Sequence, residues 1–358
     1  MSKYMDIVNF YLKIIPRMLK EGNLLLPTEA QAAREHHVSR QTIRTAYAYL
    51  ARAGLVEGRQ GSGTYLTGLL PKASQNSVML LVSTDMEYIY PELIRDIGRE
   101  LGGKGFSFRV SVTGDSILKE RNLLNAMLEN PPRGLIAECC EGTLPSPNVD
   151  LYARLRQLGT SIVFLFGKYP NDPSALCVKD DNFRGAYDLT SYLIQQNHRH
   201  IGGIFRADTC QGQERYFGFI SALRDFGCPL PDRSVLWFDR SDLYLMHKKQ
   251  DTDFLRTFIR DQLMSCTAAV CYNDEIALAL MRELRSMDIR VPEDISIASF
   301  DNSYLRHADE VRLTTMSHRP HEVGNMVSRM LQDAMSGRPV SSVEIPWTRV
   351  PGTSTRAL

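Results

Sequence analysis

Short apolar runs alternate with amphipathic stretches over most of the chain beyond residue 78, and this alternation limits the fold more than any other feature. The runs lie at 78–82, 107–112, 134–137, 162–166, 201–205, 268–272 and 295–300. Runs of this length between amphipathic segments are typical of a parallel sheet covered by helices. We therefore predict an α/β fold for the larger part of the chain.

The chain is long enough to hold more than one domain. It has 358 residues, whereas single domains usually run to about 100–200 residues. The segment 69–77 is polar, lacks periodicity and contains Pro71, so it predicts a linker. We expect one domain at 1–68, the linker at 69–77 and a second domain at 78–358.

The charge divides unevenly along the chain although the total is only +1. Residues 1–70 hold nine Lys or Arg and five Asp or Glu, a net charge of +4, and the rest hold 33 against 36, a net charge of −3. A small basic head on a mildly acidic body indicates that the head meets a polyanion.

The cysteines and the N-terminus point to a reducing compartment. Seven cysteines without a C-x-x-C pair argue against a disulfide framework and against a zinc site. The chain shows no cleavable signal pattern and no run near the roughly 18 apolar residues of a membrane span. We expect a cytoplasmic protein with no membrane contact, no metal and no cofactor.

Residues 27–54 predict two helices joined by a short turn. Thr28 and Ser39 are suited to cap their first turns. On the second helix a buried stripe is expected, formed by Ile43, Ala46, Tyr47 and Leu50. The stripe leaves four polar residues near the exposed N-terminal end, Arg40, Gln41, Thr42 and Arg44. A helix in the major groove presents its base-reading residues there, with Arg suited to guanine and Gln to adenine.

The residues after this helix pair predict a hairpin wing. Residues 55–66 form two short apolar runs around a glycine-rich tip. At the tip, Gly61 and Gly63 let the backbone approach phosphates or the minor groove, and Arg59 and Gln60 supply donors.

The head resembles a known family of bacterial repressors. The segments LPTE (26–29), VSRQTIR (38–44), GLV (54–56) and RQGSGTY (59–65) are similar to the winged helix-turn-helix of GntR-type repressors. The resemblance implies contacts with double-stranded operator DNA, made by Arg40, Thr42 and Arg44 on the second helix and by Gln60, Gly61 and Gly63 in the wing.

Polar side chains follow the apolar runs of the body. In open α/β sheets, ligands bind outside the carboxyl ends of the strands, so these residues are the candidates for a binding site. Those selected are Tyr88, Tyr90, Glu138, Asp208, Gln211, Arg215, Asn273 and Asp301. Carboxylates, amides, an arginine and a few aromatic rings suit a neutral polyhydroxylated ligand. For Asp274 the sequence favours a helix cap over a ligand contact.

The body resembles the LacI/GalR-type effector domain. The similarity rests on the segments 181–186, 198–205, 215–219, 267–278, 289–302 and 312–316. It implies two lobes of periplasmic-binding-protein type joined by crossover strands, a sugar between them, and a homodimer formed through the lobes. Arg215, Asn273 and Asp301 correspond to effector-binding residues of that family.

The combination of this head and this body is similar to the arabinose-responsive repressors. The segments 88–95, 134–138, 203–208 and 271–278 carry that similarity, which implies L-arabinose as the effector and inducer. Another sugar, or a ligand that acts as a co-repressor, remains an alternative.

Two other classes of protein share features with this chain. A sugar-processing enzyme would need a catalytic set in the cleft. Glu138 and Asp301 could serve as paired carboxylates and Cys271 as a nucleophile, but Cys271 falls in a predicted buried strand. His198 and His200 have only superficially metal-like spacing. A sugar-binding protein for transport would need no DNA-reading head, so we expect no enzyme and no transport protein.

Overall fold

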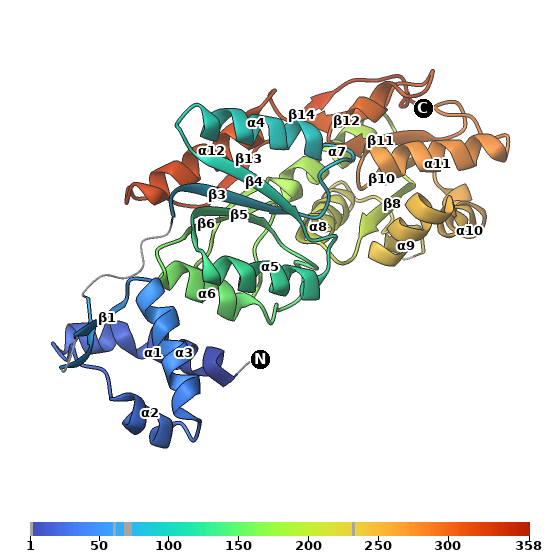
Figure 1. Ribbon diagram of the computed structural model, residues 1–358. Coiled ribbons are helices and arrows are strands. Elements are labelled where there is room, and N and C mark those ends of the chain that lie inside the picture. The colour runs from blue at the N-terminus through green and yellow to red at the C-terminus, as the bar shows by residue number, and fades with distance from the viewer. Residues whose placement is uncertain (1–2, 60–61, 68–73, 231–232) are drawn as a thin grey trace.

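The computed structural model describes residues 3–59, 62–67, 74–230 and 233–358, which form a small head and a larger two-lobed body (Figure 1). The elements of the head are α1 (Lys3–Lys20), α2 (Glu29–Glu35), α3 (Arg40–Arg52), β1 (Val56–Arg59) and β2 (Gly63–Leu66). β1 and β2 pair in antiparallel fashion. This order confirms the predicted helix pair and hairpin; residues 60–61 of the hairpin tip lie outside the described residues.

The helix caps and the buried face of α3 in the head are as the sequence predicts. The Thr28 side chain accepts from the backbone N–H of Gln31, and the Ser39 side chain accepts from that of Thr42, so both caps are confirmed. The buried stripe of α3 is confirmed as well, at Ile43, Ala46, Tyr47 and Leu50. These side chains pack against α1 in one core.

The first lobe of the body holds a six-stranded sheet in the order β13-β7-β6-β5-β3-β4, whose pairs are all parallel. Its elements are β3 (Ser74–Val82), α4 (Tyr90–Gly102), β4 (Ser107–Val112), α5 (Ile117–Glu129), β5 (Pro132–Glu138), α6 (Val149–Gln157), β6 (Ser161–Leu165), β7 (Leu176–Asp180), α12 (Glu322–Met335) and β13 (Val343–Ile345). Apolar clusters lie on both faces of this sheet.

The second lobe holds a six-stranded sheet in the order β14-β12-β11-β10-β8-β9. Its elements are α7 (Asn182–Gln195), β8 (Ile201–Arg206), α8 (Cys210–Asp225), β9 (Val235–Phe238), α9 (Arg240–Tyr244), η1 (Leu245–Lys249), α10 (Asp253–Asp261), η2 (Leu263–Ser265), β10 (Ala268–Cys271), α11 (Asp274–Ser286), β11 (Ser296–Phe300), η3 (Tyr304–His307), β12 (Thr314–Ser317) and β14 (Thr348–Val350). Only β14 runs antiparallel to its neighbour.

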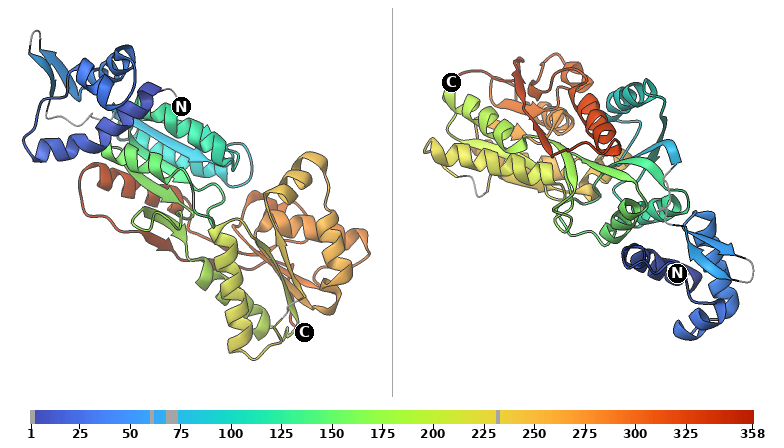
Figure 2. Two further views of the ribbon diagram at one scale, coloured as in Figure 1. Left: turned by 90° about the horizontal axis from the view of Figure 1, so that it is seen from below. Right: turned by 90° about the vertical axis from the view of Figure 1, so that its left-hand side faces the viewer.

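The chain crosses between the lobes three times, from β7 to α7, from β12 to α12 and from β13 to β14 (Figure 2). Both sheets are therefore completed by segments that return from the other lobe. This topology confirms the α/β class and the two-lobed architecture with crossover strands that the resemblance implied.

Each of the seven predicted apolar runs coincides with a strand to within two residues at its ends, apart from the longer start of β3, whereas five other strands of the body were not predicted. These are β7, β9, β12, β13 and β14, of three to five residues each. β3 begins at Ser74 rather than at residue 78, so the predicted linker 69–77 overlaps its first residues. The reason is that Ser74 pairs with Pro132 through the backbone, which polar side chains do not prevent. Residues 68–73 lie outside the described residues.

Within the described part of the chain, no helix is both long and apolar enough to cross a membrane.

Candidate functional site

The N-terminal end of α3 presents two of the predicted DNA-reading residues to solvent. Arg40 and Gln41 are exposed in the first turn. Thr42 is half-buried, and its hydroxyl lies 2.8 Å from that of Ser39, so it also stabilises the start of the helix.

The two other predicted arginines of the head are held by carboxylates. Arg44 donates from Nε and Nη2 to the two oxygens of Glu29 on α2, at 3.1 and 2.9 Å. Arg59 lies 2.7 Å from Glu57 and 4.6 Å over the ring of Tyr65. Both arginines remain largely exposed, so these pairs are weak enough to exchange for phosphate or base contacts.

The wing places Gly63 at the start of β2. Its φ of +119° is a conformation that residues with a Cβ rarely adopt, and a Cβ there would lie 3.1 Å from Leu25. Gln60 and Gly61, the other two wing residues of the prediction, lie outside the described residues.

A cavity of about 380 Å³ lies between the two lobes. Seven of the eight predicted effector-binding residues line it, Tyr88, Tyr90 and Glu138 from the first lobe and Gln211, Arg215, Asn273 and Asp301 from the second. They come together because each follows the carboxyl end of a parallel strand, and these ends of both sheets face the cleft.

The eighth residue, Asp208, lies elsewhere. Its carboxylate is 2.6 Å from Nε of Arg206 and accepts from the backbone N–H of Arg240 at 3.0 Å. It lines a separate, more open cavity, whereas Arg206 itself reaches the cavity between the lobes. Asp208 therefore orients Arg206 instead of facing the cavity.

On the first lobe, Glu138 is the centre of a small polar group. Its carboxylate accepts from the hydroxyl of Tyr90 and from the backbone N–H of Ser83, both at 2.7 Å. Burial, followed by the nearby Asp115 carboxylate, raises the pKa of Glu138 to about 7. Near neutral pH this group therefore exchanges between an acceptor and a donor of hydrogen bonds.

On the second lobe, Arg215 is buried to 3% exposure and joins several partners. Its Nε donates to Asn182 Oδ1 at 3.0 Å, Nη1 donates to the carbonyl oxygen of Tyr272, and Nη2 lies 3.4 Å from Asp301. The guanidinium also stacks over the ring of Phe300. A buried arginine with its donors engaged is a rigid feature of the cavity wall.

Several contacts join the lobes across the cavity, and two of them link functional side chains. The Tyr88 hydroxyl donates to Asp301 Oδ2 at 2.6 Å, and Arg206 Nη2 lies 2.8 Å from Asp115. Burial, then the Asp301 carboxylate, raises the pKa of Tyr88 well above its ordinary value, so the hydroxyl stays a donor. A ligand hydroxyl entering here would compete for these bonds.

Backbone conformation helps to aim two of these side chains. Tyr88 and Asp301 have φ values of 58° and 95°, which are uncommon for residues other than glycine. Such strain is held by the surrounding packing and often occurs at binding sites.

The start of α11 corrects the expectation for Asp274. Asn273 is the cap, since its Oδ1 accepts from the N–H of Ile276 at 3.0 Å. Asp274 is fully buried and accepts from Ser299, Ser303 and Thr315 at 2.6–2.7 Å. It anchors the loop that carries Asp301, which the sequence pattern could not show.

The residues weighed for catalysis do not form a set. Cys271 is buried in β10, where burial raises the pKa of its thiol. The ring nitrogens of His198 lie 2.9 Å from Thr267 Oγ1 and 3.0 Å from the carbonyl oxygen of Arg356, which is a structural role. Glu138 and Asp301 are engaged with Tyr90, Tyr88 and Arg215, on opposite lobes.

Several cavity residues were missed by sequence reasoning. They are Asp115, Asp180, Tyr272, His247 and Glu275. Asp180 was missed because β7 was not predicted, although the polar run at 180–182 marks a strand end. His247 and Glu275, 2.7 Å apart, meet only through tertiary folding.

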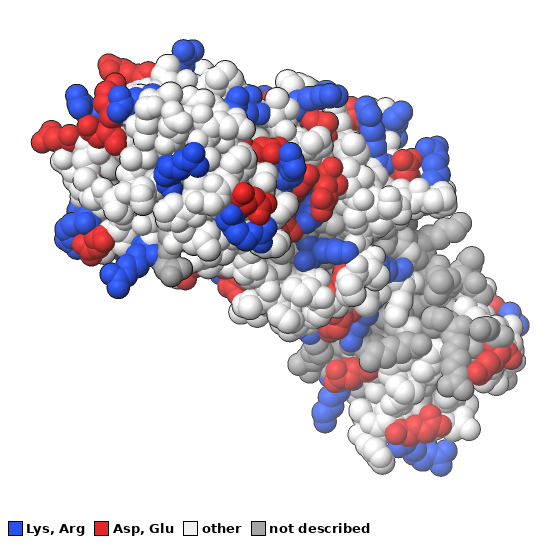
Figure 3. Space-filling model, turned by 180° about the vertical axis from the view of Figure 1, so that it is seen from behind, with Lys and Arg blue, Asp and Glu red and all other residues white. Residues whose placement is uncertain are grey.

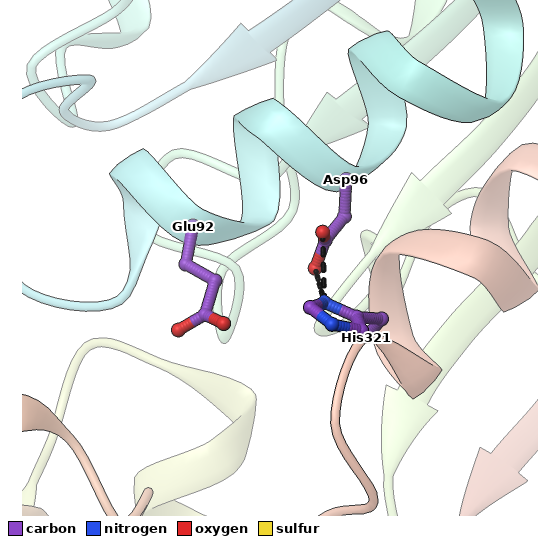
Figure 4. A group of neighbouring side chains, drawn as sticks. All are labelled: Glu92, Asp96 and His321. Atoms are coloured by element: carbon purple, nitrogen blue, oxygen red, sulfur yellow. Dashed lines mark hydrogen bonds and ion pairs between the residues drawn. The ribbon is translucent and has the colours of Figure 1, made fainter.

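One further group combines metal-ligating side chains, Glu92 and Asp96 on α4 and His321 before α12 (Figure 4). Their ligand atoms lie within 4.8 Å of one another. The Asp96 carboxylate is already compensated, since it accepts from Arg99 at 3.0 Å and lies 2.9 Å from His321 Nδ1. No sequence spacing indicated this group, because Asp96 and His321 are 225 residues apart.

Comparison with known proteins agrees with both parts of the structure. Residues 13–66 match the family of bacterial regulatory proteins of the GntR type, and residues 190–355 match the periplasmic binding protein-like domain. The solved complex of the transcriptional regulator CelR with cellobiose aligns with a TM-score of 0.68 at 20% identity, covering 92% of this chain and 100% of that one. This likeness concerns the fold.

Two curated relatives extend over nearly the whole chain. The arabinose metabolism transcriptional repressor of Geobacillus stearothermophilus is 31% identical over 345 residues, which cover 96% of this chain and 94% of the relative. That of Halalkalibacterium halodurans is 31% identical over 334 residues, which cover 90% and 88%. The chain therefore belongs to the family of arabinose metabolism transcriptional repressors, and it is a DNA-binding regulator rather than an enzyme.

Proposed function

We propose that the protein represses transcription as a homodimer bound to operator DNA, and that L-arabinose bound between the lobes releases it. The observation that carries this proposal is the cavity whose wall comes from both lobes and whose polar groups bridge them. A ligand in such a cavity changes how the lobes are arranged, and the head is attached to the first lobe.

The lining of the cavity suits a small sugar. Its volume of about 380 Å³ falls near the lower end of the usual range for small-molecule sites, about 300–1,000 Å³. Among the described residues, nothing donates to or accepts from the side-chain amide of Gln211, which leaves it available to sugar hydroxyls. Arg215, Asn273 and Asp301 lie beside it and combine donors with acceptors.

The cavity wall at Gly167 also bears on the size of the ligand. Gly167 lines the cavity, and a Cβ there would lie 3.3 Å from both Cβ and Sγ of Cys210. The neighbouring Lys168 bonds to the carbonyl oxygens of Pro173 and Ala175, so it points away from the ligand. The wall near Gly167 is therefore backbone and thiol, which favours a compact ligand such as a pentose.

The names of the two curated relatives favour arabinose over other sugars. In this mechanism two heads read half-sites one helical turn apart, since the two-fold symmetry of a dimer is mirrored in its operator. Sugar binding changes the spacing of the heads and disfavours DNA. Linkage requires the operator to weaken sugar binding by the same factor, typically about 5–150-fold.

The test uses an operator selected by the protein itself from random duplexes. Its affinity is measured by fluorescence anisotropy with L-arabinose, D-xylose, D-ribose and D-galactose, and sugar binding is measured by calorimetry with and without operator. Loss of operator affinity with L-arabinose alone supports the proposal. Equal sugar affinity with and without operator would overturn the inducer mechanism, and tighter operator binding with sugar would establish a co-repressor instead.

Gln211→Ala is the matched variant. It is expected to weaken sugar binding while the operator affinity without sugar stays unchanged, because its side chain supports no other group. Gln213→Ala, on the exposed side of the same helix, is the control and should leave both affinities unchanged.

A further inference from the structure

The three crossovers between the lobes meet at one histidine. Asp180 ends β7 in the first crossover, His318 follows β12 in the second, and Pro346 and Trp347 join β13 to β14 in the third. His318 Nε2 lies 2.9 Å from Asp180 Oδ1, and its Nδ1 lies 3.2 Å from the carbonyl oxygen of Pro346. Its ring stacks on that of Trp347, with centroids 3.7 Å apart and planes at 25°.

Both nitrogens of His318 therefore lie close to oxygen atoms, but only Nδ1 is aligned for a hydrogen bond; Nε2 and Asp180 Oδ1 are 2.9 Å apart without that alignment, as an ion-pair contact. A neutral imidazole with its proton on Nδ1 turns the Nε2 lone pair toward the carboxylate, whereas the imidazolium places a positive charge beside it. The side chain is only 12% exposed, so water cannot readily replace the missing donor. The protonated form is the one that joins all three crossovers.

The other side of Asp180 faces the effector cavity. Its Oδ2 lies 3.9 Å from Arg215 Nη2, which also lies 3.4 Å from Asp301. Asp180 and Asp301 line both the effector cavity and a neighbouring cavity of about 250 Å³ that includes His318. When His318 is protonated, the carboxylates of Asp180 and Asp301 are balanced by two cations, His318 and Arg215. When His318 is neutral, both carboxylates compete for Arg215.

Resting on the proposed function, we propose that protonated His318 is a positioning residue that clasps the three crossovers and holds Arg215 in place for the effector. Effector binding is then coupled to the protonation of His318, and the sugar response weakens as the pH rises. Burial opposes protonation of this ring, but the Asp180 carboxylate and the Pro346 carbonyl outweigh it and raise the pKa of His318.

The charged groups around the clasp come from each neighbouring element. Asp180 on β7, Asp301 after β11 and Arg215 on α8 face it, and the third crossover contributes a carbonyl oxygen and an indole. Three residues beyond His318, His321 pairs with Asp96 (Figure 4). Asp96 also pairs with Arg99. His321 makes no contact with Arg215 and thus provides a matched control in the same crossover.

The clasp has its own spectroscopic probe. The chain contains two tryptophans, so Trp237→Phe leaves Trp347 as the sole indole. An imidazolium in contact with an indole quenches its emission, so the emission of Trp347 should rise as His318 loses its proton. We expect a step with a midpoint above the ordinary histidine pKa, about 6.5. The step should be absent in His318→Gln and unchanged in His321→Gln.

The coupling is measured by calorimetry of L-arabinose with the full chain at pH 6 and pH 8.5. We expect affinity at least about fivefold tighter at pH 6, a difference at the lower end of usual coupling. The part of this difference that depends on His318 should be lost in His318→Gln and should persist in His321→Gln; Glu138, which titrates in the same cavity, accounts for the pH dependence that remains. His318→Arg keeps a cation that stacks on Trp347, so it should bind at pH 6 as tightly as the parent protein and should lose the same part of the pH dependence, which also controls for misfolding.

Two results would overturn the clasp: an emission step that survives in His318→Gln, or the same pH dependence of sugar affinity in that variant. A separate result bears on the proposed function alone. If L-arabinose binds at neither pH while the His318-dependent emission step is present, the arabinose response is wrong and the protonated clasp stands.

Discussion

Arg215 shows how a single residue can belong both to a site and to the core. Its guanidinium is nearly enclosed by Asn182, Tyr272, Phe300 and Asp301, and it still lines the effector cavity. The sequence identifies Arg215 as a candidate effector contact. The structure indicates that its removal also takes the guanidinium away from the buried carboxylates of Asp180 and Asp301.

Arg215→Ala is therefore expected to destabilise the body by about 3–5 kcal/mol, as the loss of one partner of a buried ion pair usually does. Gln211→Ala, on the same cavity, should change stability by less than about 0.5 kcal/mol. Urea unfolding of both variants measures this. Equal stability of the two variants would show that the Asp301 and Asp180 charges are compensated in another way.

Glu138 makes stability depend on pH in an unusual direction. Its pKa is raised to about 7 in the folded protein, so between its ordinary value and 7 the folded state binds more protons than the unfolded state. Stability then falls as the pH rises through this window. Glu138→Gln should make the slope of unfolding free energy between pH 5 and 7 shallower. Exposed Glu293→Gln is the control, and an unchanged slope in Glu138→Gln would contradict the shift.

At the scale of elements, close packing of helices sets the shape of the site. α7 and α8 lie against each other in the second lobe, and α8 carries Gln211 and Arg215. In the head, α2 and α3 are joined by the pair of Glu29 with Arg44. The packing of α7 against α8 positions Gln211 and Arg215, and the pairing of α2 with α3 positions Arg44.

Gly218→Ala tests the α7–α8 contact. A Cβ on Gly218 would overlap the carbonyl oxygen of Phe183, so the helices must move apart. Overpacking of this kind typically costs about 1–3 kcal/mol, and sugar affinity should fall with it. Gly102→Ala, near the end of α4 with open space around it, should be neutral or stabilising. Thermal unfolding compares the two; equal melting temperatures would mean that α7 and α8 adapt freely.

Arg44→Ala tests the α2–α3 pair. If Arg44 leaves Glu29 to read a base, operator affinity should fall about tenfold or more, with sugar affinity unchanged. A loss of less than about twofold would show that Arg44 stays with Glu29 in the complex. Arg52→Ala, in the last turn of the same helix, is the matched control in the anisotropy measurement.

For the whole molecule, the question is how a cavity between lobes reaches a distant head. The end of α3 lies beside α5 of the first lobe, where the Tyr49 hydroxyl donates to the carbonyl oxygen of Leu128 at 2.6 Å (Figure 1). Leu12 of α1 also packs against the core under α5 and α6. Acidic and basic side chains are interspersed over the face of the body in Figure 3, which offers DNA no continuous basic surface there.

Tyr49→Phe removes the hydrogen bond between head and body while keeping the ring. We expect the coupling free energy between sugar and operator to fall by about 0.5–1.5 kcal/mol, the usual contribution of one hydrogen bond. Tyr65→Phe, whose hydroxyl lies 2.8 Å from that of Ser62 within the wing, is the control. Coupling that is unchanged in Tyr49→Phe would show that the signal does not pass through this contact.

Much of this protein could be predicted from its sequence. The caps Thr28 and Ser39, the buried stripe of α3 and the seven strands with apolar runs follow from local patterns, which short-range physics alone decides. Seven of the eight candidate cavity residues meet in one cavity because carboxyl ends of parallel strands share an edge. Strands β7, β12, β13 and β14, and with β7 the cavity residue Asp180, could not be predicted, since polar residues interrupt their apolar runs.

Only the tertiary structure decided which side chains form ion pairs and hydrogen bonds with one another. The pairing of Arg44 with Glu29, the bond of Arg206 to Asp115 across the cavity and the meeting of His318 with Asp180 join residues from different elements of the chain. Whether two such side chains interact depends on the distance between them and on their burial, which their spacing in the sequence does not show. The sequence by itself determined the two parts of this protein and the edge at which a ligand binds, because periodic burial and capping act locally.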